Sequence, residues 1–322
     1  MLLGRRRKSS AILPQGATAG PAPRFARVAI SSVGLLGGSL GLALRRRGLA
    51  GHVVGVGRDA GRLEQARELG AIDSWTLKLR EACAQADLII LCGPISTIYR
   101  QVYEAIEAAP AGAVITDVGS TKRSIVERAA ARVRDGVHFI GSHPMAGSEK
   151  SGVAHATADL FEGATVVLTP DLTTSDLAVE TARELWSSLG MKVIEMLPAR
   201  HDRVVAMVSH LPHLVAAGLM EVVQHDPAED LDQARSVAAG GFRDTTRVAM
   251  GNAEVWADIF LDNNLSVVDS LDSLLRVLED LRRAIVTSNR PLLERILRRS
   301  AALRETFNEA GGGKPATHKG GR

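Results

Sequence analysis

The chain has 322 residues, of which 45% are hydrophobic and 23% are charged, as in ordinary soluble globular domains. A single hydrophobic core stops growing at roughly 250 to 300 residues, so this length favours two domains. The net charge is +3, but residues 1–24 carry +5 and residues 310–322 carry +3, which leaves −5 on the segment between them. Because this central part is acidic overall, the composition argues against nucleic-acid binding.

Both ends of the chain, residues 1–24 and 310–322, are predicted to be disordered tails. No apolar run approaches the roughly 18 residues of a membrane span, and no apolar stretch follows the N-terminal charges as in a secretory signal. Cys83 and Cys92 have neither the spacing of a disulfide framework nor that of a metal site. We therefore expect a soluble, cytoplasmic protein without a membrane partner, a nucleic-acid partner or a bound metal.

Residues 25–198 alternate short apolar segments with helical ones. A strand at Val28–Ile30, a glycine-rich turn at Gly34–Gly38, a helix at Ser39–Arg47 and a strand at His52–Val56 make a βαβ unit. Further strands are predicted at Leu88–Cys92, Ala113–Thr116, His138–Ile140, Thr165–Leu168 and Lys192–Met196, with helices at Ala60–Leu69 and Ser124–Val133. The alternation predicts an α/β domain with a mainly parallel, doubly wound sheet of the Rossmann type.

Residues 199–309 are predicted to form an all-helical second domain, since helical periodicity dominates from Asp202 to Phe307 without a convincing strand. Asp262–Thr287 is a long amphipathic stretch with apolar residues at spacings of three and four. These residues are Leu265, Val268, Leu271, Leu275, Leu278, Leu281 and Ile285. Such a stripe is most often core, but it also suits burial against a second subunit, and we expect a homodimer formed through this domain.

The segment from Ser32 to Gly38 stands where the dinucleotide fingerprint G-x-G-x-x-G belongs, directly after a strand and at the start of a helix. Gly34 allows the backbone to approach a pyrophosphate, and Gly37 allows the helix to pack closely on the strand. Ser32 replaces the first glycine, and it either has an ordinary backbone conformation or places its hydroxyl near phosphate or ribose. The predicted cofactor-binding residues of this loop are Ser32, Gly34, Leu35, Leu36 and Gly37.

The end of the second strand bears on the choice of cofactor. The acid that would bind the 2′-hydroxyl of NAD is expected where Gly57 stands, and Arg58 follows it. A small residue followed by Arg is the pattern for a 2′-phosphate, so NADP is favoured over NAD. The alternatives are that Arg58 is a solvated surface residue and that Asp59 reaches a ribose.

Two polar residues are predicted at the carboxyl edge of the sheet, where ligands bind in such folds. Ser120 follows the strand at Ala113–Thr116, and His143 follows the strand at His138–Ile140. A histidine has an ordinary pKa near 6.5 and readily accepts a proton at neutral pH. The plain alternatives are that Ser120 caps the next helix and that His143 is a turn residue.

Five segments of the chain have a distinctive composition and order. They are Gly34-Leu35-Leu36-Gly37-Gly38-Ser39-Leu40, Asp117-Val118-Gly119-Ser120-Thr121-Lys122, His143-Pro144-Met145-Ala146-Gly147-Ser148-Glu149-Lys150-Ser151-Gly152, Ser209-His210-Leu211-Pro212-His213 and Gly240-Gly241-Phe242-Arg243-Asp244-Thr245-Thr246-Arg247. Together they resemble the prephenate and arogenate dehydrogenases of tyrosine biosynthesis. The resemblance covers about residues 27–260. It implies the oxidative decarboxylation of prephenate to 4-hydroxyphenylpyruvate and CO2, with hydride transfer to NAD(P)+.

The resemblance also implies roles for individual residues. His143 would deprotonate the 4-hydroxyl of the substrate ring, Ser120 would hydrogen-bond near the nicotinamide, and Arg247 would hold a substrate carboxylate. The other implied substrate-binding residues are His213, Ser148, Glu149 and Trp256. Ser32 and the Gly57-Arg58 pair depart from the family pattern. These departures bear on how the cofactor is bound and on which cofactor is used, and not on the reaction.

Three other interpretations remain. Arogenate carries the same ring as prephenate, so the same base would serve for either substrate. A 3-hydroxyacid dehydrogenase would need a Lys in the helical domain, and Asp202 to Phe307 contains none. A catalytically silent cofactor-binding protein would not be expected to keep His143, Ser120 and Arg247 together.

Overall fold

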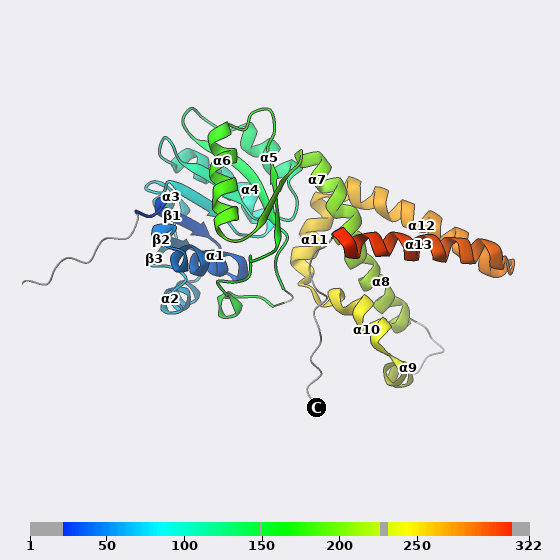
Figure 1. Cartoon of the computed structure of the whole chain (residues 1–322). Coiled ribbons are helices and arrows are strands. Elements are labelled where there is room, and N and C mark those ends of the chain that lie inside the picture. The colour runs from blue at the N-terminus through cyan, green and yellow to red at the C-terminus, as the bar shows by residue number, and fades with distance from the viewer. Residues whose placement is uncertain (1–21, 149, 226–230, 311–322) are drawn as a thin grey trace, which may run out of the picture. The chain divides into compact units, whose positions relative to one another are not determined.

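The computed structural model describes residues 22–148, 150–225 and 231–310 (Figure 1). Most of the two predicted tails, and Glu149, therefore lie outside the described residues. Within these residues the chain forms two compact units. The first runs to His201 and also includes Gly251–Ile259, which the sequence placed in the helical domain; the second comprises Asp202–Met250 and the chain from Phe260 onward.

The first unit is built on one sheet, as predicted. Eight described strands lie in the order β3-β2-β1-β4-β5-β6-β7-β8, and the first six are parallel. β7 is antiparallel to β6, while β8 is parallel to β7. The strands are β1 (Phe25–Ser31), β2 (Ala50–Val56), β3 (Ser74–Thr76), β4 (Leu88–Leu91), β5 (Val114–Asp117), β6 (His138–Pro144), β7 (Thr165–Thr169) and β8 (Lys192–Glu195). The strand order reverses between β1 and β4, and this reversal defines the switch point where a doubly wound sheet binds its ligand.

Helices cover both faces of the sheet (Figure 1). One buried apolar cluster includes side chains from α1 (Leu35–Arg46), α2 (Ala60–Glu68) and α6 (Asp176–Ser188). The other includes side chains from α3 (Leu79–Cys83), α4 (Ile95–Ala108) and α5 (Arg123–Ala130). The strands between them are nearly continuous apolar runs because both of their faces are buried.

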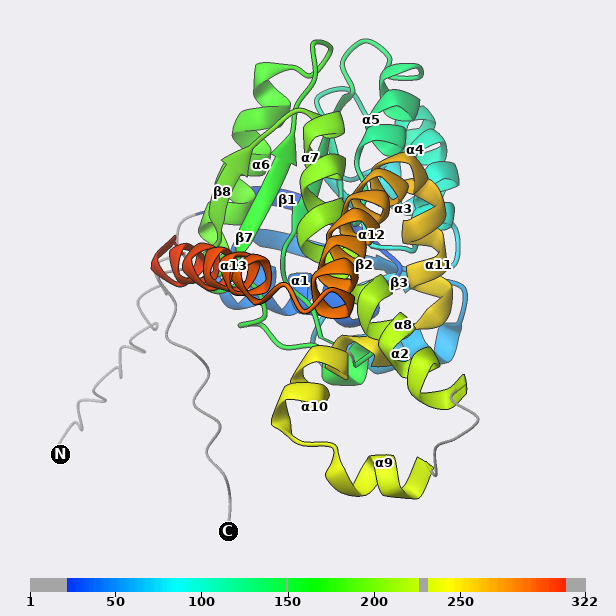
Figure 2. The same cartoon turned by 90° about the vertical axis from the view of Figure 1, so that its right-hand side faces the viewer.

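The second unit is helical in its described part (Figure 2). Its helices are α7 (Pro198–Val205, shared with the first unit), α8 (Leu211–His225), α9 (Leu231–Val237), α10 (Gly240–Thr246), the end of α11 (Ala253–Asp262), α12 (Asn264–Val286) and α13 (Arg290–Ala310). Between α7 and α8 the chain forms a π-helical segment, Ala206–His210. Pro212 has no N–H with which to continue the α-helical pattern, and the wider turn accommodates this loss.

The apolar stripe predicted on Asp262–Thr287 lies on α12, but it is not core in the described chain. Leu265 is 72% exposed and Ile285 is 63% exposed, whereas the buried positions of α12 are Val267, Ser270 and Ala284. The packing of α12 against its own unit therefore leaves most of the stripe uncovered.

One apolar segment corrects an expectation from the sequence. Pro198–Gln224 is, by length and composition, long and apolar enough to cross a membrane, although no such run was expected. A single segment of this kind does not establish a membrane span, because core helices of soluble domains meet the same criterion. Only 28% of its apolar window is buried, so other helices of the chain leave much of it uncovered.

Candidate active site

A crevice of about 1120 Å³ lies at the switch point of the sheet, within the first unit. It is lined by residues that follow the carboxyl ends of β1, β2, β4 and β5, namely Ser32, Gly57, Cys92 and Val118. The predicted site residues that line it are Ser32, Gly34, Leu35, Leu36, Arg58, Ser120 and Ser148. The structure thus brings the cofactor loop and Ser120 beside the same cavity, whereas His143, which was expected at the same edge of the sheet, is not among the residues that line it.

The loop between β1 and α1 has the shape that a dinucleotide requires. Gly34 is the N-cap of α1 and has no side-chain cap, so the first N–H groups of the helix are available to an anion. A Cβ on Gly34 would meet no described atom closer than 3.9 Å, whereas a Cβ on Gly37 would lie 2.9 Å from the Ser32 carbonyl oxygen. Gly34 leaves room for a ligand, and Gly37 permits close packing of helix on strand.

Ser32 has φ +56°, in the left-handed region that favours glycine. The alternative that it has an ordinary backbone conformation is therefore wrong. An L-residue pays about 1–2 kcal/mol in this region, so the serine side chain is retained at a cost. This observation favours the other alternative, a hydroxyl that contacts the cofactor.

Ser32→Gly is expected to raise stability by up to about 1 kcal/mol, because it relieves the left-handed strain. If the hydroxyl contacts the cofactor, the same change weakens cofactor binding by about 3- to 10-fold, the value of one hydrogen bond. Denaturation and cofactor titration measure the two effects. Ser288→Gly is the matched control, since Ser288 has φ +52° and lies in the second unit: it should stabilise the protein and leave cofactor binding unchanged. Unchanged binding in Ser32→Gly would contradict a role for the hydroxyl.

Two arginines line the crevice beyond the end of β2. Arg58 is exposed and was predicted, while Arg62 lies one turn into α2 and was not. Asp59 also lines the crevice, but its Oδ1 accepts a hydrogen bond from the Arg62 backbone N–H at 2.9 Å and caps α2. This part of the crevice combines two guanidinium groups with one carboxylate that is engaged at a helix end.

A buried ion pair supports the loop that carries Ser120. Lys122 Nζ donates to Asp117 Oδ2, and both side chains are fully buried. The same carboxylate accepts the backbone N–H of Gly119 at 2.8 Å and that of Ser142 at 3.3 Å. Burial raises the pKa of Asp117, and Lys122 and the two N–H groups act against that rise. The pair ties the Ser120 loop to β6, the strand that contains His143.

Ser120 is not the cap of α5, which was its alternative role. The N-cap of α5 is Lys122, which makes no side-chain cap hydrogen bond. Ser120 is half-buried and lines the crevice.

His143 lies inside β6 rather than after it, because Gly141–Pro144 pair with β7 and so lengthen the strand. The ring is 8% exposed, and its Nδ1 lies 2.8 Å from Nε2 of His201, which is fully buried. The rings meet edge to face with centroids 5.0 Å apart. His143 is therefore not a turn residue, and a second histidine holds it in place.

Two predicted substrate-binding residues lie in the second unit. His213 is 6% exposed with its ring 6.0 Å from that of Phe260, and burial lowers its pKa, which favours the neutral ring. Arg247 is exposed at the start of a 3-10 helix, Arg247–Met250. His210 contacts Asn263 at 3.3 Å. No group of three potential metal ligands was found in the described part of the chain.

The remaining predicted residues belong to the first unit. Ser148 is exposed, lines the crevice and accepts the Lys150 backbone N–H at 3.0 Å. Trp256 is half-buried on α11 and does not line the crevice, although Val255 and Ile259 of the same helix do. Asp258 accepts a hydrogen bond from Ser96 Oγ at 2.6 Å, which fastens this part of α11 to α4.

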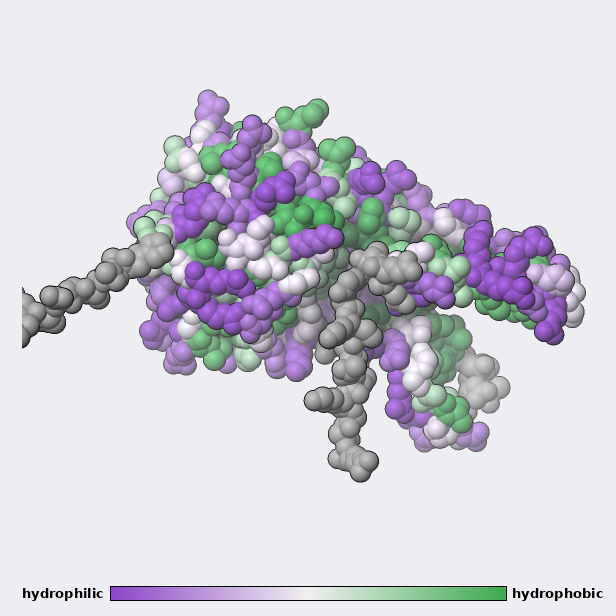
Figure 3. Space-filling model, in the orientation of Figure 1, coloured by the Kyte–Doolittle hydropathy of each residue, from purple (hydrophilic) through white to green (hydrophobic). Residues whose placement is uncertain are grey.

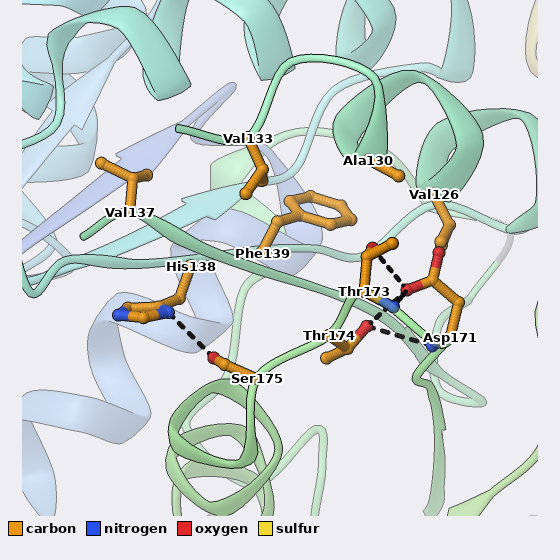
Figure 4. A pocket seen from close by; sticks show the side chains of 10 residues that line it. All are labelled: Val126, Ala130, Val133, Val137, His138, Phe139, Asp171, Thr173, Thr174 and Ser175. Atoms are coloured by element: carbon orange, nitrogen blue, oxygen red, sulfur yellow. Dashed lines mark hydrogen bonds between the residues drawn. The ribbon is translucent and has the colours of Figure 1, made fainter. Parts of the chain in front are cut away.

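A second pocket is too small to be a substrate site. It lies where α5 and the start of β6 meet the loop before α6, and His138 Nδ1 there lies 2.8 Å from Ser175 Oγ (Figure 4). Asp171 accepts hydrogen bonds from Thr173 and Thr174 within its own turn. The hydrogen bonds drawn in Figure 4 join residues of this pocket to one another, which indicates a structural role.

Sequence reasoning missed His201, Arg62 and the Asp117–Lys122 pair. His201 is 58 residues from its partner, and nothing in the local sequence distinguishes it from a surface histidine. Asp59 is a good N-cap residue, so it could have indicated a helix start. A helix start there places Arg62 in the first turn, near the end of β2. Asp117 and Lys122 belong to one of the segments that resemble the family, but a lysine is rarely expected to be fully buried.

Comparisons with known proteins identify the family. Residues 40–195 match the family model "Prephenate dehydrogenase, nucleotide-binding domain", and residues 197–299 match "Prephenate dehydrogenase, dimerization domain". The prephenate dehydrogenase of Bacillus subtilis is 35% identical over 257 residues, which cover 79% of this chain and 69% of that protein.

Solved structures agree. A prephenate dehydrogenase from A. aeolicus in complex with hydroxyphenyl propionate and NAD+ superimposes with a TM-score of 0.81 at 32% identity, covering 88% of this chain and 98% of that one. Synechocystis arogenate dehydrogenase gives a TM-score of 0.76 at 33% identity, covering 87% and 99%. The chain is thus an oxidoreductase that belongs to the prephenate dehydrogenase family.

Proposed function

We propose that this protein catalyses the oxidative decarboxylation of prephenate to 4-hydroxyphenylpyruvate and CO2, with NADP+ as the preferred hydride acceptor. The observation that carries the proposal is the buried His143, held through Nδ1 on the strand next to the loop of Ser120. Arogenate is the alternative substrate. We also propose that the enzyme works in the cytoplasm.

The residues of the first unit suit such a reaction. The free N–H groups of α1 and the open space over Gly34 fit a pyrophosphate. The nicotinamide cofactor, when bound at the Ser32–Gly37 loop, would supply the acceptor for the hydride on the ring carbon that bears the 4-hydroxyl. His143 would take the hydroxyl proton at Nε2, since Nδ1 is engaged, and loss of the ring carboxylate as CO2 restores aromaticity. Ser120 would fix the approach of the substrate to the cofactor.

In the second unit, Arg247 is proposed to bind a substrate carboxylate, for which a planar guanidinium is well suited. The buried, neutral His213 is proposed to hydrogen-bond the substrate. Trp256, Ser148 and Glu149 are also proposed to bind the substrate. Glu149 lies outside the described residues.

Initial rates with prephenate and arogenate, each with NAD+ and NADP+, test the proposal. The highest kcat/KM is expected for prephenate with NADP+. A higher kcat/KM for arogenate would identify arogenate as the substrate. A higher kcat/KM with NAD+ would refute the cofactor preference.

The preference for NADP is proposed for two reasons. Arg58 and Arg62 both line the crevice near the end of β2, and the position where an acidic residue would bind the 2′-hydroxyl of NAD is occupied by Gly57. Arg58→Ala and Arg62→Ala are each expected to raise the KM for NADP+ by about tenfold or more, the value of a charge-assisted hydrogen bond, with little change in the KM for NAD+. Arg67→Ala is the matched control, because Arg67 lies on the same helix and pairs with Glu64 instead. Equal changes in both KM values would show that the arginines do not read the 2′-phosphate.

A homodimer formed through the helical domain is proposed as the assembly. The family model that matches residues 197–299 is described as a dimerization domain. The stripe on α12 and the apolar α8 leave large side chains exposed, including Val222 at 69%. Figure 3 shows hydrophobic residues on the surface of the helical unit beside hydrophilic ones. A second copy of the chain would bury them.

A further inference from the structure

We propose that His201 is a positioning residue for the reaction: it accepts a hydrogen bond from Nδ1–H of His143 and so keeps Nε2 of His143 unprotonated. The inference rests on the proposed role of His143 as the base. It gives a chemical role to a histidine on α7 that the sequence motifs did not single out, and it explains why the contact at Nδ1 of His143 matters.

The geometry is that of a direct hydrogen bond between two imidazoles. His143 Nδ1 and His201 Nε2 are 2.8 Å apart, and the ring planes are inclined by 68°. An edge-to-face arrangement lets an in-plane N–H of one ring point at a ring nitrogen of the other. His201 is fully buried and His143 nearly so, so bulk water does not compete for this bond.

Such a bond needs one proton between the two nitrogens. The ring that carries this proton determines whether Nε2 of His143 can act as a base. If His201 donates, Nδ1 of His143 is the acceptor, and the neutral His143 ring carries its proton on Nε2. That tautomer cannot accept a proton from a hydroxyl at Nε2. If His143 donates, Nε2 keeps its lone pair and can act as the base. Only the second arrangement is compatible with catalysis, and it requires the neutral His201 ring to carry its proton on Nδ1.

The same bond would act during the proton transfer. When His143 accepts a proton at Nε2 it becomes an imidazolium, whose Nδ1–H is a stronger donor than that of the neutral ring. His201 Nε2 then stabilises the charged ring, and its position prevents the ring from rotating. A positioning group that fixes the tautomer of a catalytic histidine strongly affects kcat, as the serine protease triad illustrates.

Two substitutions of similar length separate acceptor chemistry from packing. His201→Gln can place an amide oxygen near the position of Nε2, while His201→Met fills similar volume without a comparable acceptor. His201→Met is expected to lower kcat by about 10²-fold, with KM and cofactor affinity changed by less than about threefold. His201→Gln is expected to stay within about fivefold of the unmodified enzyme. Near-normal kcat in His201→Met, or an equal loss in both variants, would overturn the proposal.

The tautomer itself can be read without turnover. ¹⁵N-detected NMR of the histidine side chains, nine in the chain, with His143 assigned by His143→Asn, should show His143 protonated on Nδ1 and not on Nε2. An Nε2–H tautomer would overturn the proposal even if His201→Met fails to fold. Absence of turnover with both prephenate and arogenate in the unmodified enzyme would refute the proposed function instead, and the NMR result would still report on the His143–His201 bond.

Discussion

Replacing His143 with Asn is expected to lower kcat by about 10²- to 10⁴-fold, the usual contribution of a general base. Asn retains a polar side chain of similar reach but cannot accept a proton at neutral pH. Cofactor binding should survive, because the loop from Ser32 to Gly37 is built from β1 and α1 and His143 does not line the crevice. Steady-state kinetics and cofactor titration measure the two effects.

His138→Asn is the matched control for this change. His138 begins the same strand, β6, but its ring meets Ser175 beside the small pocket. This variant should turn over at close to the normal rate. Near-normal turnover in His143→Asn, or an equal loss in both variants, would remove His143 from the role of base.

The largest effect on stability is expected from Lys122→Met. The change leaves the carboxylate of Asp117 fully buried without its cation, and breaking a buried pair in this way costs about 3–5 kcal/mol. Urea unfolding followed by Trp fluorescence measures the loss, because Trp75, Trp186 and Trp256 all lie in the first unit. The variant should also bind cofactor more weakly, since the ion pair supports the loop that carries Ser120.

Lys78→Met is the matched control. Lys78 also pairs with a carboxylate, that of Glu81, but its side chain is 74% exposed, and exposed pairs contribute little. The urea midpoint of this variant should match that of the unmodified protein. A similar midpoint for Lys122→Met would show that the buried pair does not hold the Ser120 loop.

The regular part of the first unit could be predicted because its signals are local. The strands at Val28–Ile30 and Leu88–Cys92 are apolar runs buried on both faces, and the turn after β1 is marked by its glycines. The same reading missed β3, whose three residues carry no clear pattern. It also ended β6 too early, because the pairing of Gly141–Pro144 depends on β7, more than 20 residues later in the chain.

The candidate site was predictable where a residue follows a strand and not where its role depends on a distant contact. Ser120 and the cofactor loop lie beside the crevice as expected. The contact of His143 with His201 joins β6 to α7. The periodicity of apolar residues along the sequence cannot predict a contact between residues so far apart in the chain. The sequence does not determine the conformation of Ser32, because a serine at a glycine position is compatible with either backbone region. Exposure of the α12 stripe was equally undetermined, since a protomer core and a subunit interface have the same apolar pattern.

Hydride transfer and loss of CO2 are expected to occur together on a cyclohexadienol ring. This coupling is tested by incubating the purified protein with prephenate and NADP+, and with arogenate in parallel, while measuring reduced cofactor and released CO2. Reduced cofactor and CO2 should form in equal amounts with at least one substrate, and almost none of either should form in His143→Asn. Reduced cofactor without CO2, or no reaction with either substrate, would contradict it.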